Sequence, residues 1–390
     1  DAGADVRAVT VWSLLGAYDW HTLVTREEGV YEPGVFDVRG PSPRPTAIAH
    51  MVGDLAVKGR HDHPTLAVPG WWHRPDRFHY GRAIGSDVPG PGSDELETRG
   101  ARPIAIVGED GPVVSALVFA CRERSIPFHV LSGWTALNSD PATVAEQLRT
   151  MEAWAVLDGC VRDPVDGAEC VSGGCVRCRQ DILASATIAA ACRQLDIPLL
   201  TVSSDLVFDG HRKAPYVESI PVSPIGICHR MRAEHERRIL TAHSSTIVVR
   251  TGPLFGWEGQ LDPISQALRA LAKGELFMAD DEVRSPTYVP DFTHAALDLL
   301  LDSERGIWHL ANTGSASWFD LARRGTELAG IDPSRLTSRE RHARVASKRR
   351  PRRILESERG WLLPELDDAL ARHVQATWKT MDGMREDLAA

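Results

Sequence analysis

The segment Ile104-Ala105-Ile106-Val107-Gly108-Glu109-Asp110-Gly111-Pro112-Val113-Val114 decides the fold class. It begins with a short, wholly apolar run rich in β-branched residues, which is typical of a strand buried on both faces. A turn with glycines follows, and the proline at its end suits the first turn of a helix, which we expect over residues 112–124. Strand, glycine turn and helix in this order indicate the start of a βαβ unit with a helix N-terminus that can bind phosphate.

The same rhythm continues along the chain. Short apolar runs alternate with helix-like stretches, and strands are predicted over residues 104–107, 128–131, 155–157, 199–203 and 246–250. This alternation indicates a parallel, doubly wound sheet with right-handed crossovers. We therefore expect an α/β protein with a Rossmann-type sheet from about residue 101 onward.

The composition limits the classes of function. Of the 390 residues 43% are hydrophobic and 25% are charged, as in ordinary soluble globular chains. The net charge of −9 lacks the basic excess of nucleic-acid and anionic-membrane binders, so we expect neither partner. No apolar run reaches the length of a membrane span. Seven cysteines without a signal-peptide pattern favour reduced thiols and a cytoplasmic location.

The glycine turn predicts a nucleotide cofactor, NADP or NAD. Gly108 and Gly111 would let the backbone approach a pyrophosphate, although Val114 stands where a third glycine is usual and two acidic residues lie in the turn. After the second strand, the position that would contact the ribose 2′-hydroxyl falls near Ser132, which selects neither cofactor. A strand-to-helix turn without a ligand is the alternative.

Further motifs follow one another in a characteristic order. They are Ser203-Ser204-Asp205-Leu206-Val207-Phe208-Asp209-Gly210, Arg284-Ser285-Pro286-Thr287-Tyr288, His309-Leu310-Ala311-Asn312 and Ser317-Trp318-Phe319. In order and spacing they resemble the dTDP-4-dehydrorhamnose reductases of the extended short-chain dehydrogenase superfamily, over residues 101–375. The resemblance implies a Rossmann domain with a smaller C-terminal substrate domain, NAD(P)H as hydride donor and a 4-keto-6-deoxy nucleotide sugar as substrate. Residues 376–390 are then a C-terminal tail, and a homodimer is left open.

The resemblance also implies the site residues. The family's assisting hydroxyl corresponds to Ser204, and its Tyr-x-x-x-Lys pair falls on Cys228 and Arg232. Ser203 is expected near the cofactor. The residues expected to bind the substrate are Asp205, Arg250, Ser285, Pro286 and Thr287.

Because Cys228 and Arg232 replace the tyrosine and lysine of the family, the sequence does not decide whether the chain is an active reductase. Reduction of a ketone needs an acid for the developing alkoxide and a cation near the nicotinamide ribose. A thiol, with an ordinary pKa of about 8.5, is acidic enough, but it reaches less far than a phenol. No Tyr-x-x-x-Lys occurs anywhere in the chain. The alternative to a reductase is therefore a non-catalytic regulatory module that binds a nucleotide or nucleotide sugar.

The first hundred residues have a different character. Val11-Trp12-Ser13-Leu14-Leu15-Gly16-Ala17-Tyr18-Asp19-Trp20, Gly29-Val30-Tyr31 and Arg44-Pro45-Thr46-Ala47 resemble the C-terminal end of family 1 glycoside hydrolases, over residues 6–57. The resemblance implies the last strand and helix of a TIM barrel, here over residues 6–15 and 46–58, with Asp19 and Trp20 at a sugar.

Both catalytic carboxylates of that family lie upstream of the matching segment, so no glycosidase activity is expected from this chain alone. We expect residues 1–58 to be a partial TIM-barrel tail and residues 59–100 to be an extension and linker, rich in proline and glycine. A truncated fusion, in which this chain is the reductase-like half and a glycosidase domain precedes it, is a further alternative.

Cys170, Cys175 and Cys178 form a Cys-x4-Cys-x2-Cys run. This spacing occurs in iron–sulfur loops, which need a fourth thiolate, here from Cys160 or Cys192. Zinc is the other metal that the run could hold, because Cys175 and Cys178 are separated by only two residues. Unpaired thiols are the simpler interpretation, so the sequence predicts no metal.

Overall fold

The computed structural model describes residues 5–22, 25–27, 29–68, 70, 101–108, 111–131, 140–159, 176–256, 263–271, 276–279, 282–339 and 350–389. Within them, the centre of the molecule is a six-stranded parallel sheet with the strand order β14-β9-β8-β7-β5-β6. Its strands are β5 (Ile104–Val107), β6 (Phe128–Leu131), β7 (Ala155–Asp158), β8 (Leu199–Ser204), β9 (Ile247–Thr251) and β14 (Gly306–His309). The predicted Rossmann-type sheet is confirmed.

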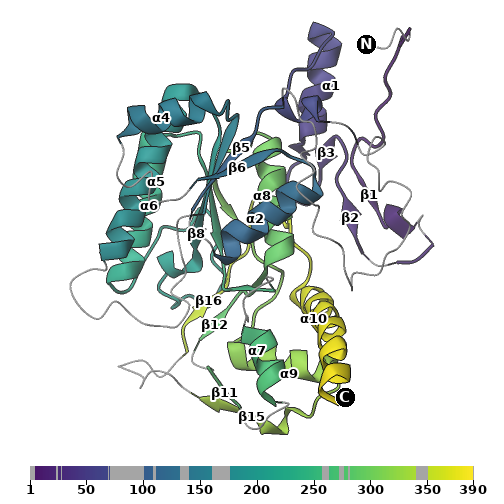
Figure 1. Cartoon of the computed structure of the whole chain (residues 1–390), viewed down its shortest axis with the longest axis vertical. Helices are drawn as coiled ribbons and strands as arrows, with labels where there is room; N and C mark the ends of the chain where they lie inside the picture. The colour runs from purple at the N-terminus through teal and green to yellow at the C-terminus, as the bar shows by residue number, and fades with distance from the viewer. Residues whose placement is uncertain are drawn as a thin grey trace.

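Helices cover both faces of this sheet (Figure 1). On one face α2 (Pro112–Glu123) packs beside α8 (Val289–Leu301), and on the other α4 (Pro141–Thr150), α5 (Val176–Leu195) and α6 (Ile227–Ala242) lie in a row. The side chains of β5 show why its sequence is wholly apolar. Ile104 and Ile106 enter the core under α2, while Ala105 and Val107 enter the core on the opposite face.

The strand order places a topological switch point at β5. The chain passes from β5 to β6 on one side and then crosses to β7 on the other side of β5. Helices on opposite faces diverge at such a switch point, and open α/β sheets bind their ligands there, at the carboxyl ends of the strands.

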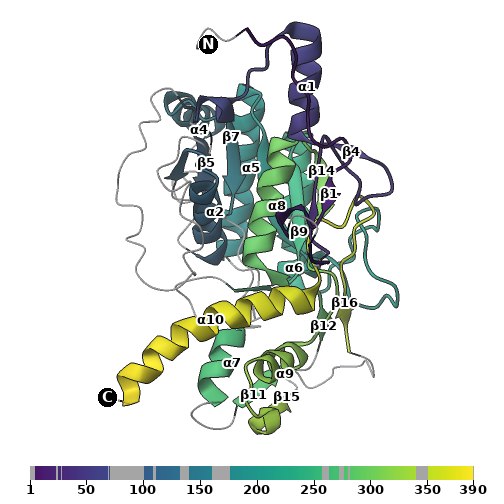
Figure 2. The ribbon, with the colours of Figure 1, turned by 90° about the vertical axis from the view of Figure 1, so that its right-hand side faces the viewer.

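The carboxyl edge of the sheet meets a smaller C-terminal lobe, as predicted. Figure 2 shows this lobe below the sheet. It contains α7 (Pro263–Leu271), α9 (Trp318–Leu328), α10 (Leu366–Ala389) and the parallel pairs β10 (Leu254–Phe255) with β13 (Thr287–Tyr288), β11 (Leu276–Ala279) with β15 (Leu336–Arg339), and β12 (Val283–Arg284) with β16 (Arg352–Arg353). These helices share one apolar core, and α10 crosses residue 375 without a break.

The strand predicted over residues 6–15 is wrong. Among the described residues this segment belongs to no sheet: Val6, Val9 and Trp12 are exposed, although the carbonyl oxygens of Ser13 and Leu14 accept hydrogen bonds from the N–H groups of Val35 and Phe36. Only short pairs form here, β1 (Ala17–Tyr18) with β2 (Tyr31–Glu32) and β3 (Phe36–Asp37) with β4 (Arg44–Pro45). The predicted helix is present as α1 (Ala47–Lys58). The likeness of this segment to a barrel tail stays a prediction.

The N-terminal segment packs on the Rossmann lobe at the amino end of β14. Arg44 forms an ion pair of 2.5 Å with Asp302, which also accepts a 2.6 Å hydrogen bond from the backbone N–H of Ala47. The indole of Trp308 lies under the guanidinium groups of Arg44 and Arg359, 5.7 and 3.9 Å from its ring centroid. The contact lies at the opposite end of the strands from the carboxyl edge.

Candidate functional site

Two glycines lie at the ends of the strands that flank the switch point. Gly108 follows β5 with φ +159°, and a Cβ there would lie 2.6 Å from Cγ2 of Val114. Gly159 follows β7, and a Cβ there would lie 3.0 Å from the same methyl group. The two strand ends and the first turn of α2 therefore approach one another closely, with Val114 in van der Waals contact where a third glycine is usual.

The start of α2 can receive an anion. Gly111 is its N-cap residue and provides no side chain to accept hydrogen bonds from the first-turn N–H groups, and Pro112 occupies the first turn. Free N–H groups and the positive end of the helix dipole favour a phosphate at this position. Ser132 and the residues between Gly108 and Gly111 lie outside the described residues.

The end of β8 presents two buried serines. The Oγ atom of Ser203 donates a 2.5 Å hydrogen bond to Oε1 of Glu236 on α6. Ser204 caps the short helix η4 (Asp205–Val207), since its Oγ accepts a hydrogen bond from the N–H of Leu206 and donates one to Asp205 at 3.1 Å. Ser204 therefore stands where β8 ends and η4 begins.

The first two turns of α6 bring the other predicted catalytic residues to this edge. Cys228 is half-buried in the first turn, and Arg232 follows four residues later on the same side of the helix. α6 packs against η4 and against β8. The structure thus gathers Ser204, Cys228 and Arg232 at one end of the sheet, as predicted; their catalytic roles stay predictions.

Arg250 lies in a buried polar network. Its guanidinium forms a 2.7 Å ion pair with Glu236 and approaches Nε2 of His309 at 3.4 Å. Nδ1 of His309 lies 2.9 and 3.1 Å from two backbone carbonyl oxygens, so it carries the proton and leaves Nε2 to accept from Arg250. Burial and the charge of Arg250 lower the pKa of His309 and keep the ring neutral. A contact between Arg250 and substrate stays a prediction.

The other predicted substrate residues sit at the junction of the two lobes. Asp205 is fully buried and receives the Arg284 guanidinium through Nε at 2.7 Å and through a second, very short contact. Ser285 accepts a hydrogen bond from the backbone of Leu355, and its own carbonyl accepts one from Thr287. Pro286 is buried between them. The Asp205–Arg284 pair connects the lobes, and contact of these residues with a substrate stays a prediction.

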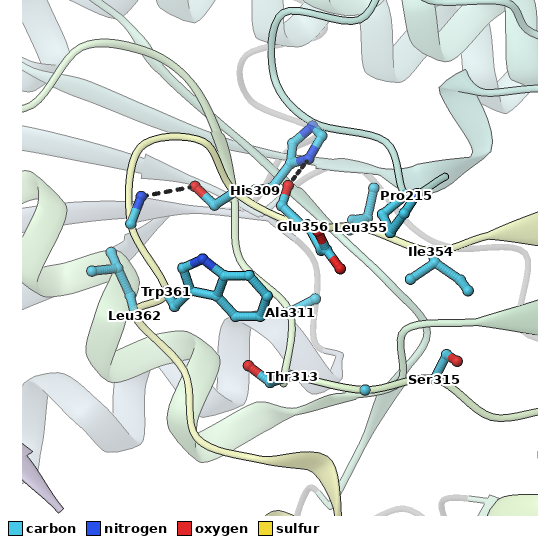
Figure 3. Close-up of a pocket in the computed structure, with 13 residues that line it drawn as sticks. Pro215, His309, Ala311, Thr313, Ser315, Ile354, Leu355, Glu356, Trp361 and Leu362 are labelled. Carbon is cyan, nitrogen blue, oxygen red and sulfur yellow. Dashed lines mark hydrogen bonds between the residues drawn. The ribbon is translucent and has the colours of Figure 1, made fainter. Parts of the chain in front are cut away.

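A cavity of about 290 Å³ lies at the carboxyl end of β14, between that strand and the 354–362 segment. Figure 3 shows Trp361 on one wall and the hydroxyl-bearing Thr313 and Ser315 on another, with His309 above them. None of the predicted catalytic or substrate residues lines it. The motif that begins at His309 was noted in the sequence, but its contribution to a cavity was not foreseen.

Sequence reasoning also missed two histidines on α6. Burial and the charges of Arg353, Arg232 and Arg284 lower the pKa of His229 to about 4. His235 is wholly buried, and burial lowers its pKa to about 4 as well, although Asp158 acts in the opposite direction. Their closeness in the sequence to Cys228 and Arg232, on the same helix, could have indicated that they lie near the site.

The cysteine run falls mostly outside the described residues. Cys160, Cys170 and Cys175 are not among them, and neither is the side chain of Cys178 in α5. Cys192 is buried in the core, where burial raises its pKa. Among the residues that the structure describes, no group of three His, Cys, Asp or Glu side chains is arranged to hold a metal ion, and no helix is long and apolar enough to span a bilayer.

The fold is that of a Rossmann-type α/β protein with a smaller second lobe at the carboxyl edge of its sheet. The family described as the RmlD substrate binding domain matches residues 102–359. The chain belongs to this family.

Curated relatives carry reductase names. The chain is 31% identical over 176 residues to a dTDP-4-keto-6-deoxy-D-glucose reductase of Streptomyces niveus, which covers 45% of this chain and 61% of that protein. It is 34% identical over 204 residues to a dTDP-4-dehydrorhamnose reductase of Mycolicibacterium smegmatis, covering 49% and 62%. With the Mycobacterium tuberculosis protein of that name it shares 32% over 241 residues, covering 60% and 77%. The matches thus span about three fifths of the first two relatives.

Solved structures share the fold. A dTDP-4-dehydrorhamnose reductase from Yersinia enterocolitica aligns with a TM-score of 0.60 at 19% identity, over 71% of this chain and 99% of that one. The Bacillus anthracis enzyme, solved in complex with NADP, aligns with a TM-score of 0.59 at 21% identity, over 70% and 98%.

Proposed function

We propose that this chain is a nucleotide-sugar reductase that uses NAD(P)H to reduce a 4-keto-6-deoxy sugar. The observation that carries the proposal is the packing of α6, which bears Cys228 and Arg232 in its first two turns, against η4, which Ser204 caps. Relatives of 31–34% identity are named as reductases of this substrate class, which supports the same chemistry here.

The ends of β5 and β7 and the start of α2 have features that suit a dinucleotide cofactor. Gly108 and Gly159 leave the backbone of two strand ends open to a ligand, and the uncapped start of α2 at Gly111 is suited to its pyrophosphate. When bound there, NAD(P)H supplies the hydride. The bound cofactor in the Bacillus anthracis neighbour supports this assignment.

In this proposal Cys228 replaces the usual tyrosine as the acid. The Ser204 hydroxyl, which in the structure donates to Asp205, turns to donate a hydrogen bond to the ketone oxygen, and the Cys228 thiol transfers its proton to that oxygen as it becomes an alkoxide. The thiolate left behind is stabilised by the Arg232 guanidinium one turn away and regains a proton from water. Arg232 also serves as the cation beside the ribose, as a planar fork rather than a point charge.

A second candidate is a regulatory module that binds the nucleotide sugar without reducing it. The observation in its favour is Cys228 itself, because a thiol reaches less far than a phenol and a misplaced proton donor slows the reaction by about a hundredfold per ångström.

Cofactor binding and turnover separate the two. Quenching of protein fluorescence by NADPH measures binding, and loss of NADPH absorbance with dTDP-4-keto-6-deoxyglucose measures reduction. The reductase predicts both signals. Binding without oxidation would support the regulatory module, and absence of binding would reject both proposals.

We also propose the cytoplasm as the compartment. Cys121, Cys192 and Cys228 are free thiols among the described residues, as expected for a reducing environment.

A further inference from the structure

His229 lies next to the predicted proton donor and faces the junction of the two lobes. It follows Cys228 in the first turn of α6, which packs against η4, where Asp205 follows Ser204. Its electrostatic neighbours come from several elements: Arg353 of β16, Arg232 of α6, Arg284 of β12 and Asp205 of η4. His229 is therefore on the helix that packs against η4, whose cap is Ser204, and its side chain is half-buried.

Burial first, and then the surrounding cations, lower the pKa of His229 and keep this imidazole uncharged. Arg284 is paired with Asp205, and Arg353 is paired with Glu282 at 2.5 Å, so neither guanidinium is free to move away. A positive charge on His229 would be repelled by these groups, and burial opposes it further. A neutral imidazole carries one N–H donor and one lone pair.

The environment of the two ring nitrogens decides which one carries the proton. Nδ1 is enclosed and has no hydrogen-bond partner among the described residues, while the side chain as a whole is only half-buried. An orphaned buried N–H is rarer than an under-satisfied buried acceptor. The favoured tautomer therefore leaves the lone pair on enclosed Nδ1 and carries its proton on Nε2.

We propose that His229 donates a hydrogen bond from Nε2 to an oxygen of the sugar bound beside Ser204. The inference rests on the proposed function and names a contact that the family motif does not contain. A neutral imidazole is a suitable partner for a carbonyl or alkoxide oxygen, because it can polarise that oxygen without giving up its proton.

Binding of dTDP-4-keto-6-deoxyglucose in the presence of NADP+, which cannot donate a hydride, tests the proposal by calorimetry. His229→Phe removes the donor while keeping a ring, and should weaken sugar binding about tenfold. His229→Gln restores an N–H near Nε2 and should bind within about twofold of the unaltered chain. His211→Phe, at an exposed loop histidine, is the matched control.

The possible results are distinct. Unchanged sugar affinity in His229→Phe, or equal weakening in His229→Phe and His229→Gln, would overturn the hydrogen bond. A parallel loss of NADPH affinity in His229→Phe would indicate a folding defect and would also count against it. If the unaltered chain binds NADPH but no nucleotide sugar, the proposed function fails and the inference fails with it.

Discussion

The Oγ atom of Ser203 donates a 2.5 Å hydrogen bond to Oε1 of Glu236, and this bond fastens α6 to the end of β8. The same carboxylate accepts hydrogen bonds from Nε and Nη2 of Arg250 on β9. Glu236 thus fixes the position of α6, which carries Cys228 and Arg232, relative to strands β8 and β9. The position of these two residues beside Ser204 depends on this buried contact.

Glu236→Gln should destabilise the fold. The change leaves the buried Arg250 guanidinium without its counter-charge, and breaking a buried pair in this way costs about 3–5 kcal/mol. Urea denaturation measures the loss. Glu234→Gln, which touches only exposed arginines on the same helix, should cost less than about 1 kcal/mol. Equal losses for the two variants would show that the buried pair has no special part in stability.

The N-terminal segment should unfold together with the Rossmann lobe. Arg44→Met removes the cation between Asp37 and Asp302, both of which are largely buried, and should lower the free energy of unfolding by about 3 kcal/mol. Lys58→Met, at an exposed pair in α1, should change it by less than about 0.5 kcal/mol. A single urea transition is expected throughout. A wild-type midpoint for Arg44→Met would mean that the segment is not fastened by this contact.

The stability should fall as the pH is lowered toward 4. In the folded protein His229 and His235 have a pKa of about 4, below the ordinary value of about 6.5. Between these values the unfolded chain binds more protons, so the free energy of unfolding rises with pH up to about 6.5 and then levels off.

His235→Leu tests this dependence, because both ring nitrogens of His235 lack a hydrogen-bond partner in the described part of the chain. The variant should be at least as stable as the wild type at neutral pH and should lose less stability at about pH 5. His211→Leu, at an exposed position, should keep the wild-type slope. Urea midpoints at the two pH values give the comparison. An undiminished slope in His235→Leu would assign the effect to other groups.

Restoring the family's acid and cation should raise turnover. In the double variant Cys228→Tyr, Arg232→Lys a phenol regains the reach that the thiol lacks, and a gain of about a hundredfold in the rate of NADPH oxidation is expected. Steady-state rates with dTDP-4-keto-6-deoxyglucose measure it, and Cys121→Ser, at a buried cysteine of α2, controls for loss of a thiol elsewhere. A rate no higher than that of the unaltered chain would show that these two positions do not limit the chemistry.

Much of the Rossmann lobe could be predicted because its local patterns agree with its packing. The apolar run at residues 104–107 has core on both faces, so composition alone marks it as a strand. The segment at residues 6–15 has similar apolar residues but forms no strand in the described part of the chain, and no local pattern distinguishes it from a strand.

The candidate site was predictable in part. The motif at Ser204 and the helix at Cys228 meet as expected, because both lie at the carboxyl edge of the sheet. Their partners were not predictable. Asp205 bonds Arg284, which lies 79 positions away in the sequence, and no local pattern around either residue indicates this pair. The neutrality of His229 likewise depends on arginines from β12 and β16.

The most direct test of the central claim is the fate of the hydride. The chain is incubated with dTDP-4-keto-6-deoxyglucose and NADPH that carries deuterium at the transferred position, and the sugar nucleotide is analysed by mass spectrometry and NMR. We expect a reduced sugar with deuterium on the former ketone carbon, formed faster than in a Ser204→Ala variant. An unreduced sugar, recovered after NADPH binding has been demonstrated in the same sample, would contradict it.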